Sequence, residues 1–331
     1  FLTILITIGL IFLYTYRGGI GTIIWTDTLQ TFFMLLAVGL ATVILARELD
    51  LSFTGIIKEI GESDHSRIWF FENFIGDGKH FVKYFLGGAF ITITMTGLDQ
   101  DMMQKNLTCK NKKEAQKNML VFSFSFLITV FLFLGLGVLL FIYAEKSGIT
   151  VPENTDDLYP LLALNHFGLP VGIAFLLGIT AAAYSSADSA LTALTTSFSI
   201  DFLKIEKYEE HKKQKIKKWS HLFFSVLLIL LILLFRAINN ESIVVAVFRV
   251  AGYTYGPILG LFVFGIYSKR KVNDKWIPFV GILAPILSFF ISKYSEIIFN
   301  GYKFGFELLI LNGLLTIVGL FLFSKKYVLK D

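Results

Sequence analysis

The segment 181–201, AAAYSSADSALTALTTSFSID, is apolar enough for a membrane helix and yet carries eleven hydroxyl or carboxyl side chains. On a helix, Ser185 and Ser189 are one turn apart, and Ser186 and Ser189 form a pair three residues apart. Hydroxyls, a carboxylate and backbone carbonyls are hard oxygen donors, which suit a small hard cation and not zinc or copper. The alternative is structural, because Ser and Thr often bond to the carbonyl one turn back or join neighbouring helices.

Three ionisable side chains lie inside apolar runs, where a charge is costly and therefore marks a candidate functional site: Asp27, Asp188 and Arg249. From the helical rise, Asp27 and Asp188 lie about 7 Å and 6 Å to one side of the middle of their helices. The two carboxylates can therefore share a layer. Arg249 lies roughly 9 Å to the other side, which makes it a weaker counter-charge. The natural counter-charge is then a mobile cation or a proton, and we predict a sodium site.

The elements that must position these side chains are apolar runs of about 17 to 25 residues, the length that crosses a hydrocarbon core roughly 30 Å thick. With 55% hydrophobic and 17% charged residues, the chain is predicted to be an all-α polytopic membrane protein. The candidate helices are nine: 1–13, 19–46, 80–98, 118–143, 168–200, 219–235, 243–267, 276–292 and 304–324. Since Phe1 lies within an apolar run, we expect an incomplete chain.

Basic residues alternate between successive connecting segments. Twenty Lys and Arg residues fall in 14–18, 99–117, 201–218, 268–275 and 325–331, and nine fall in 47–83, 144–167, 236–242 and 293–303. The positive-inside rule predicts that the first set, and with it the C-terminus, is cytoplasmic. The segment 201–218 is then a cytoplasmic basic connector, either simply solvated or in contact with acidic lipid. The net charge of +5 reports this orientation and not nucleic-acid binding.

The sequence allows two interpretations for each of two segments. The outer segment 64–83 mixes aromatic and charged side chains, which fits an amphipathic helix at the interface and fits an ordinary aromatic belt equally well. In GYTYGPILGLF at 252–262, Gly256 and Pro257 break or bend a helix late in its span. The bend is either a gating kink or the turn toward the cytoplasm.

Three stretches of the chain resemble the motifs of one known family. YTYRGGIGTIIWTDTLQ resembles a stretch of two glycines, a Trp-Thr-Asp and a Gln that opens the fifth core helix of that family. GLDQDMMQKNLTCKNKKEAQKNML resembles the segment after core helix six, and AAAYSSADSALTALTTSFSIDF resembles core helix eight. The stretches occur in family order, and over essentially the whole chain the sequence resembles the sodium:solute symporters, which include the proline, sialic acid and sodium/glucose cotransporters.

The resemblance implies a five-plus-five inverted-repeat (LeuT-like) transporter fold with the substrate near the bilayer middle. The chain would be a partial form of that fold: a single transmembrane transporter domain over 1–331 that lacks the first three or so core helices and has about nine. The implied coupling ion is Na⁺, and the implied partners are a small-molecule solute (a sugar, an amino acid or an organic acid) and the lipid bilayer. The expected location is the bacterial inner membrane, and the oligomeric state stays open.

The resemblance also implies the main sodium ligands. The carbonyl of Ala182 and the hydroxyls of Ser185 and Ser186 match the family's helix-eight ligands, and the remaining family ligands are carbonyls of core helix one. We place that helix upstream of Phe1.

Some members have a second sodium site, which maps here onto Asp27, Ser185, Asp188 and Ser189. Asp188 departs from the family, which usually has a hydroxyl at that position. The site would therefore bind a cation or a proton, hold two carboxylates that share a proton, or be empty.

The substrate pathway departs from the sugar-transporting members, which place an aromatic pair just before the Gly of the helix-six motif. Met95 and Thr96 stand there in this chain, which argues against a stacked sugar platform. Thr92, Met95 and Thr96 are candidate pathway residues, and ordinary helix packing is the alternative for the threonines.

The leading functional prediction is sodium-coupled secondary active symport by alternating access, which needs no covalent chemistry and hence no enzyme. The enzymatic alternative is an intramembrane aspartyl protease in which Asp27 and Asp188 share a proton. The residues before them, Thr26 and Ala187, do not match the Tyr-Asp pattern that is usual in such proteases. A non-transporting solute sensor is the third alternative, because symporter-like domains are sometimes fused to signalling modules.

Overall fold

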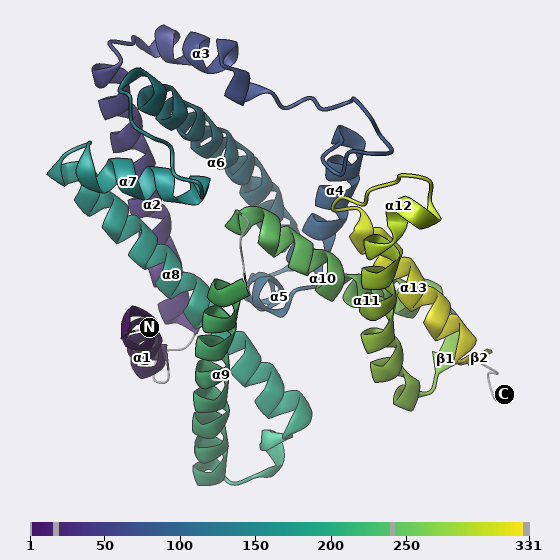
Figure 1. Ribbon diagram of the computed structural model, residues 1–331. Helices are drawn as coiled ribbons and strands as arrows, with labels where there is room; N and C mark the ends of the chain where they lie inside the picture. The colour runs from purple at the N-terminus through teal and green to yellow at the C-terminus, as the bar shows by residue number, and fades with distance from the viewer. Residues whose placement is uncertain (1, 16–19, 239–241, 327–331) are drawn as a thin grey trace. The chain divides into compact units, whose positions relative to one another are not determined.

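The computed structural model describes residues 2–15, 20–238 and 242–326, and these residues are mostly helical (Figure 1). Phe1 and the glycines Gly18 and Gly19 of the first family-like motif lie outside the described residues. Within the described part, six helices are long and apolar enough to cross a membrane, and shorter apolar helices lie at Thr3–Leu13, Phe81–Gly97 and Leu308–Leu322. The chain forms two units, one of Phe1–Ser66 with Lys112–Asn240 and one of Arg67–Asn111 with Glu241–Asp331.

The first unit is built from helices joined by short 3-10 turns. Its helices are α1 (Leu2–Thr15), α2 (Ile20–Glu48), α3 (Phe53–Glu62), α6 (Lys112–Lys146), α7 (Leu158–Asn165), α8 (Leu169–Ser197) and α9 (Glu210–Ile238). The 3-10 turns are Asp64–Ser66, Thr155–Asp157 and Ile205–Lys207, and a π-helical turn at Phe198–Phe202 follows α8.

The core of the first unit lies where α2, α6, α7 and α8 meet. Its fully buried side chains include Ala41, Leu45, Leu162 and Val171. Tyr159, on the short helix α7, donates a hydrogen bond to the Ala37 carbonyl of α2 at 3.1 Å, and burial raises the pKa of this phenol to about 12. The hydrogen bond fixes α7 against α2.

Helix α9 begins at Glu210, well before the predicted start at 219. The added N-terminal turns are rich in lysine, which is a good helix former, so the helix begins before the apolar run does. The basic connector 201–218 is therefore helical over its second half.

The amphipathic-helix interpretation of 64–83 is wrong. The amphipathic helix lies upstream as α3, where the Ser52 hydroxyl caps the N-terminus by accepting from the Gly55 amide at 3.2 Å. Residues 67–80 contain no helix, since Asn73 adopts φ 51° and its side chain accepts from the Gly76 amide at 2.9 Å.

The second unit contains helices and one pair of short strands. Its elements are α4 (Phe81–Gly97), α5 (Gln100–Leu107), α10 (Ile243–Tyr267), β1 (Arg270–Val272), α11 (Ile277–Lys293), α12 (Ser295–Ile298), α13 (Leu308–Leu322) and β2 (Ser324–Lys326), with a 3-10 turn at Asp274–Trp276. The strands pair antiparallel with Val272 opposite Ser324, and Trp276 stacks on Phe323 with ring centroids 4.4 Å apart. The strands correct the all-α prediction, since three-residue strands are too short to show a period-two pattern.

Helix α10 packs against α13 through three glycines spaced four residues apart: Gly252, Gly256 and Gly260. A Cβ atom at Gly256 would lie 2.5 Å from Cβ of Asn312, and one at Gly260 would lie 2.7 Å from the Gly313 carbonyl oxygen. Only a residue without a side chain fits at these two positions.

The helix continues through Pro257, so the interpretation of 252–262 as the turn toward the cytoplasm is wrong. A proline inside a helix lacks the amide that would bond the carbonyl four residues earlier, which is that of Tyr253. The Asn312 side chain of α13 donates to this carbonyl at 2.7 Å and to the Gly252 carbonyl at 3.1 Å. The neighbouring helix thereby supplies the hydrogen bond that Pro257 cannot make, so the Tyr253 carbonyl is not left without a donor.

A lysine is buried near the start of α4. Lys83 is 1% exposed, and its ammonium donates to the Lys303 carbonyl at 2.5 Å and lies 3.9 Å from the centre of the Tyr302 ring. Tyr302 donates to Glu307 at 2.9 Å, and burial together with this bond raises the pKa of its phenol. The cation thus ties α4 to the segment that precedes α13.

We expect Lys83→Met to lower the free energy of unfolding by about 3 kcal/mol, because it removes a buried cation–π contact and the donor to a carbonyl. Lys79→Met is the control, since Lys79 is exposed, and it should change the stability by less than about 0.5 kcal/mol. Thermal unfolding in detergent micelles measures both variants. An equal loss in the two would show that the Lys83 contacts do not stabilise the protein.

Candidate functional site

The candidate site lies in the first unit, where α2 packs against α8 (Figure 1). Gly178 permits the close approach, since a Cβ at this position would lie 3.3 Å from the Phe33 carbonyl oxygen of α2. Further along the same helix pair, the Ser185 hydroxyl of α8 donates a hydrogen bond to the Asp27 carboxylate of α2. The structure therefore joins two side chains that lie far apart in the sequence and were both predicted site residues.

The polar side chains of α8 differ in burial. Ser185 and Ser189 are 5% exposed and Asp188 is fully buried, and the three share one helix face. Ser186 projects about 100° away around the helix and is exposed within its unit. Ala182, one turn before Ser186, is half-buried, and its carbonyl belongs to an unbroken stretch of α8.

The donor set fits a small hard cation. A serine hydroxyl has one proton and two lone pairs, and the Ser185 proton is donated to Asp27, so both lone pairs can face an ion. The Asp27 carboxylate and the Ser186 hydroxyl are further hard oxygen donors, the type that alkali and alkaline-earth ions prefer. Asp188 adds a second carboxyl group one turn from Ser185, and a group buried this deeply needs a cation, a donor or a proton beside it.

The predicted pathway residues lie on α4, in the second unit. The Thr92 hydroxyl donates to the Gly88 carbonyl at 2.8 Å, a bond within its own helix. Met95 packs against a cluster that contains Ile91, Leu259 and Leu309, and Thr96 is half-buried. Helix bonding and packing therefore account for Thr92 and Met95 within this unit, and their role in a pathway stays a prediction.

Arg249, the weaker counter-charge candidate, belongs to the second unit. It lines a cavity of about 210 Å³ together with Lys79, Tyr84 and Tyr253. This cavity is a feature of the second unit alone, and the sequence offered no signal for it beyond the arginine itself.

Sequence reasoning missed two polar contacts. Tyr255 of α10 donates to the Asp99 carboxylate, just after α4, at 2.8 Å. Asp99 stands in the GLDQ of the second family-like stretch, which was a signal for it. In the first unit, the buried side chains of Thr195 and His221 lie 3.1 Å apart, and His221 stacks on Phe12. Thr195 and His221 lie on different helices and 26 residues apart, so no local spacing in the sequence predicted this pair.

Comparison with known proteins gives a consistent result. Residues 1–275 match the model of the sodium:solute symporter family. The sodium/sialic acid symporter SiaT of Proteus mirabilis is 26% identical over 299 residues, which cover 86% of this chain and 58% of that protein. The human sodium/iodide cotransporter is 25% identical over 269 residues, which cover 77% of this chain and 40% of that protein.

A solved structure shows the same fold. It is a substrate-bound outward-open state of a Na⁺-coupled sialic acid symporter, with a TM-score of 0.75 at 21% identity, over 98% of this chain and 68% of that one. The chain spans 58% of the length of the two bacterial sialic acid symporters that it matches. The family model covers most of the chain, and the chain belongs to the sodium:solute symporter family.

Proposed function

We propose that the complete protein couples inward sodium flow to the uptake of a small organic solute by alternating access. The observation that carries this proposal is the hydrogen bond from Ser185 to Asp27, which gathers hard oxygen donors between two membrane helices. Relatives named as sodium-coupled carriers of sialic acid, iodide and monocarboxylates support the same function. A membrane potential supplies about 2.3 kcal/mol per charge per 100 mV, in addition to the sodium gradient.

The proposed architecture is one transmembrane domain of the five-plus-five inverted-repeat type with nine membrane helices. The six long apolar helices and the three shorter ones support this count. The distribution of basic residues supports a cytoplasmic C-terminus. Bacterial relatives support a location in the bacterial inner membrane.

The proposed main sodium site takes the Ala182 carbonyl and the hydroxyls of Ser185 and Ser186. The second site takes Asp27, Asp188 and Ser189, with Ser185 shared between the two. These residues hold the ion: Asp27 supplies charge, Ser185 links the sites, and Ser186 presents its hydroxyl on the exposed side of α8. Replacing Asp188 by serine distinguishes a bound proton from a bound cation at this position. Loss of a proton site would change how uptake depends on pH, and loss of a cation site would change how uptake depends on sodium.

The solute is proposed to be a sugar, an amino acid or an organic acid. Thr92, Met95 and Thr96 are the proposed pathway residues of α4. The Thr92 hydroxyl keeps its lone pairs after donating to Gly88, so it can still accept from a solute.

Uptake into proteoliposomes tests the proposal, with protein expressed from the complete gene. With an inward sodium gradient and an interior-negative potential, we expect accumulation of at least one of a labelled sialic acid, a monocarboxylate and an amino acid. Potassium in place of sodium should abolish it. Peptide cleavage without solute flux would favour the aspartyl protease, and solute binding without flux would favour the sensor. Absence of both flux and sodium binding would refute the proposal.

A further inference from the structure

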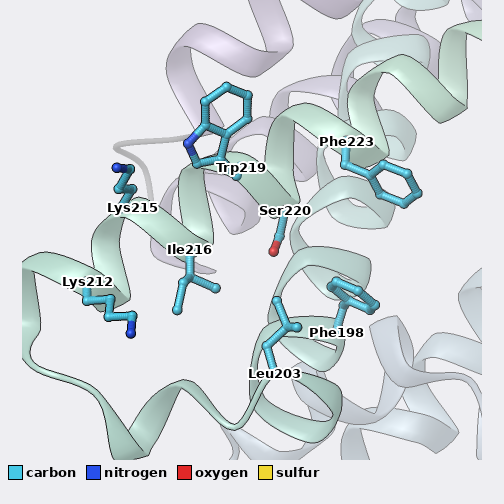
Figure 2. A pocket seen from close by; sticks show the side chains of 8 residues that line it. All are labelled: Phe198, Leu203, Lys212, Lys215, Ile216, Trp219, Ser220 and Phe223. Atoms are coloured by element: carbon cyan, nitrogen blue, oxygen red, sulfur yellow. The ribbon is translucent and has the colours of Figure 1, made fainter.

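An open groove of about 520 Å³ lies in the first unit, between the end of α8 and the first turns of α9 (Figure 2). Its walls are predominantly apolar, and two lysines stand at its edge. The residues that matter for its chemistry are Phe198, Leu203, Ile216, Trp219, Lys212 and Lys215. In Figure 2, Ile216 points from α9 toward Leu203, and the two lysines lie toward the end of the drawn part of α9 that is away from Phe223.

The π-helical turn Phe198–Phe202 shapes one wall. It continues α8 as a wider turn, and Phe198 is held in place by the rings of Phe224 and Phe223, with centroids 5.4 Å and 6.5 Å away. The opposite wall is the start of α9. The groove is therefore bounded by two packed elements of one unit.

The groove lies where α9 changes from charged to apolar. Residues 211–218 contain five lysines and no acidic residue, and the apolar run follows at once. Trp219 stands at this boundary and is 61% exposed, as is typical of a tryptophan at a membrane interface. The lysine-rich side is the one that the positive-inside rule places in the cytoplasm, where the leaflet carries anionic lipids.

We propose that this groove binds one anionic phospholipid of the cytoplasmic leaflet. The ammonium groups of Lys212 and Lys215 contact the headgroup phosphate, and the walls formed by Phe198, Leu203 and Ile216 contact an acyl chain. Lys212 lies over the Tyr208 ring at 4.2 Å, which holds its stem beside the groove. A free phosphate ion would use the lysines but would leave the apolar walls uncovered, so the combination favours a lipid. The site is independent of the sodium ligands and of the proposed transport.

The test uses the complete protein in vesicles, with every tryptophan except Trp219 replaced by phenylalanine. The vesicles are phosphatidylcholine with a minority of phosphatidylglycerol, and one of the two lipids carries bromine on its acyl chains. At equal mole fraction, brominated phosphatidylglycerol should quench Trp219 about tenfold more effectively than brominated phosphatidylcholine, since two lysines near an anionic surface supply at least that preference. Added inorganic phosphate should leave the preference unchanged.

Matched variants locate the site. Lys212→Gln with Lys215→Gln should abolish the preference, whereas Lys217→Gln with Lys218→Gln removes the same charge from residues outside the groove lining and should retain it. Ile216→Phe should fill the groove and lower the preference with all lysines present. Equal quenching by both lipids, no quenching by either, equal loss in both lysine pairs, or competition by free phosphate would each overturn the proposal.

Discussion

Replacing Asp27 by alanine is expected to raise the sodium concentration that half-saturates solute uptake by about a hundredfold. The substitution removes the carboxylate that accepts a hydrogen bond from the Ser185 hydroxyl where α2 packs against α8. Removing one partner of a close charge pair, here the carboxylate that faces the proposed sodium ion, costs roughly 3 kcal/mol, and each 1.4 kcal/mol corresponds to about a tenfold change in affinity. A loss of this size would leave uptake at ordinary sodium concentrations close to background.

The measurement is initial uptake in proteoliposomes over a series of sodium concentrations. Asp27→Asn separates charge from shape, because the amide keeps the acceptor for Ser185 and loses the negative charge. Glu48→Ala is the control, since Glu48 is an exposed acidic residue at the end of the same helix. An Asp27→Ala protein with normal stability and unchanged sodium dependence would exclude Asp27 as a ligand.

Gly260→Leu is expected to lower the free energy of unfolding by about 3 kcal/mol, the upper end of the usual cost of overpacking. The reason is the approach of α13, where even a Cβ atom would lie 2.5 Å from Cβ of Thr316 and 2.7 Å from the Gly313 carbonyl oxygen. Backbone atoms cannot turn away as a flexible side chain can, so the two helices would have to separate.

Gly265→Leu is the matched control for this prediction. Gly265 lies in the same helix, and a Cβ at this position meets nothing within 4 Å among the described residues. The change from glycine to a good helix former should be neutral or slightly stabilising there. Thermal unfolding in detergent compares the pair, and equal destabilisation by both leucines would show that packing against α13 is not the cause.

Sequence patterns predicted the membrane helices best where the apolar run and the helix begin and end at the same residues. The run 243–267 coincides with α10, since Ser242 precedes it and polar residues follow it directly. The start of α9 was missed because lysines end an apolar run without ending a helix. The strands β1 and β2 were missed because a pair of three-residue strands depends on the ends of α10 and α13 meeting in space.

Some residues of the candidate site could be predicted from the sequence, and other polar contacts could not. The helical rise and the family resemblance both pointed to Asp27 and to the α8 hydroxyls, and a hydrogen bond joins Asp27 to Ser185. That sodium binds there stays a prediction. The roles of Lys83 and Asn312 could not be predicted, since each bonds to backbone carbonyls in distant segments, which carry no side-chain signature. The groove beside Lys212 could not be predicted either, because the π-helical turn that forms one of its walls has no sequence period of its own.

The bond between Asn312 and the Tyr253 carbonyl has a mechanical consequence. Bending α10 at Pro257, or sliding α13 along it, would lengthen this 2.7 Å hydrogen bond and leave the Tyr253 carbonyl without its donor in an apolar setting. The glycine contacts at Gly256 and Gly260 resist the same displacements by steric exclusion. The two helices therefore behave as one rigid body, and any conformational change in this unit must move α10 and α13 together, with its hinges elsewhere.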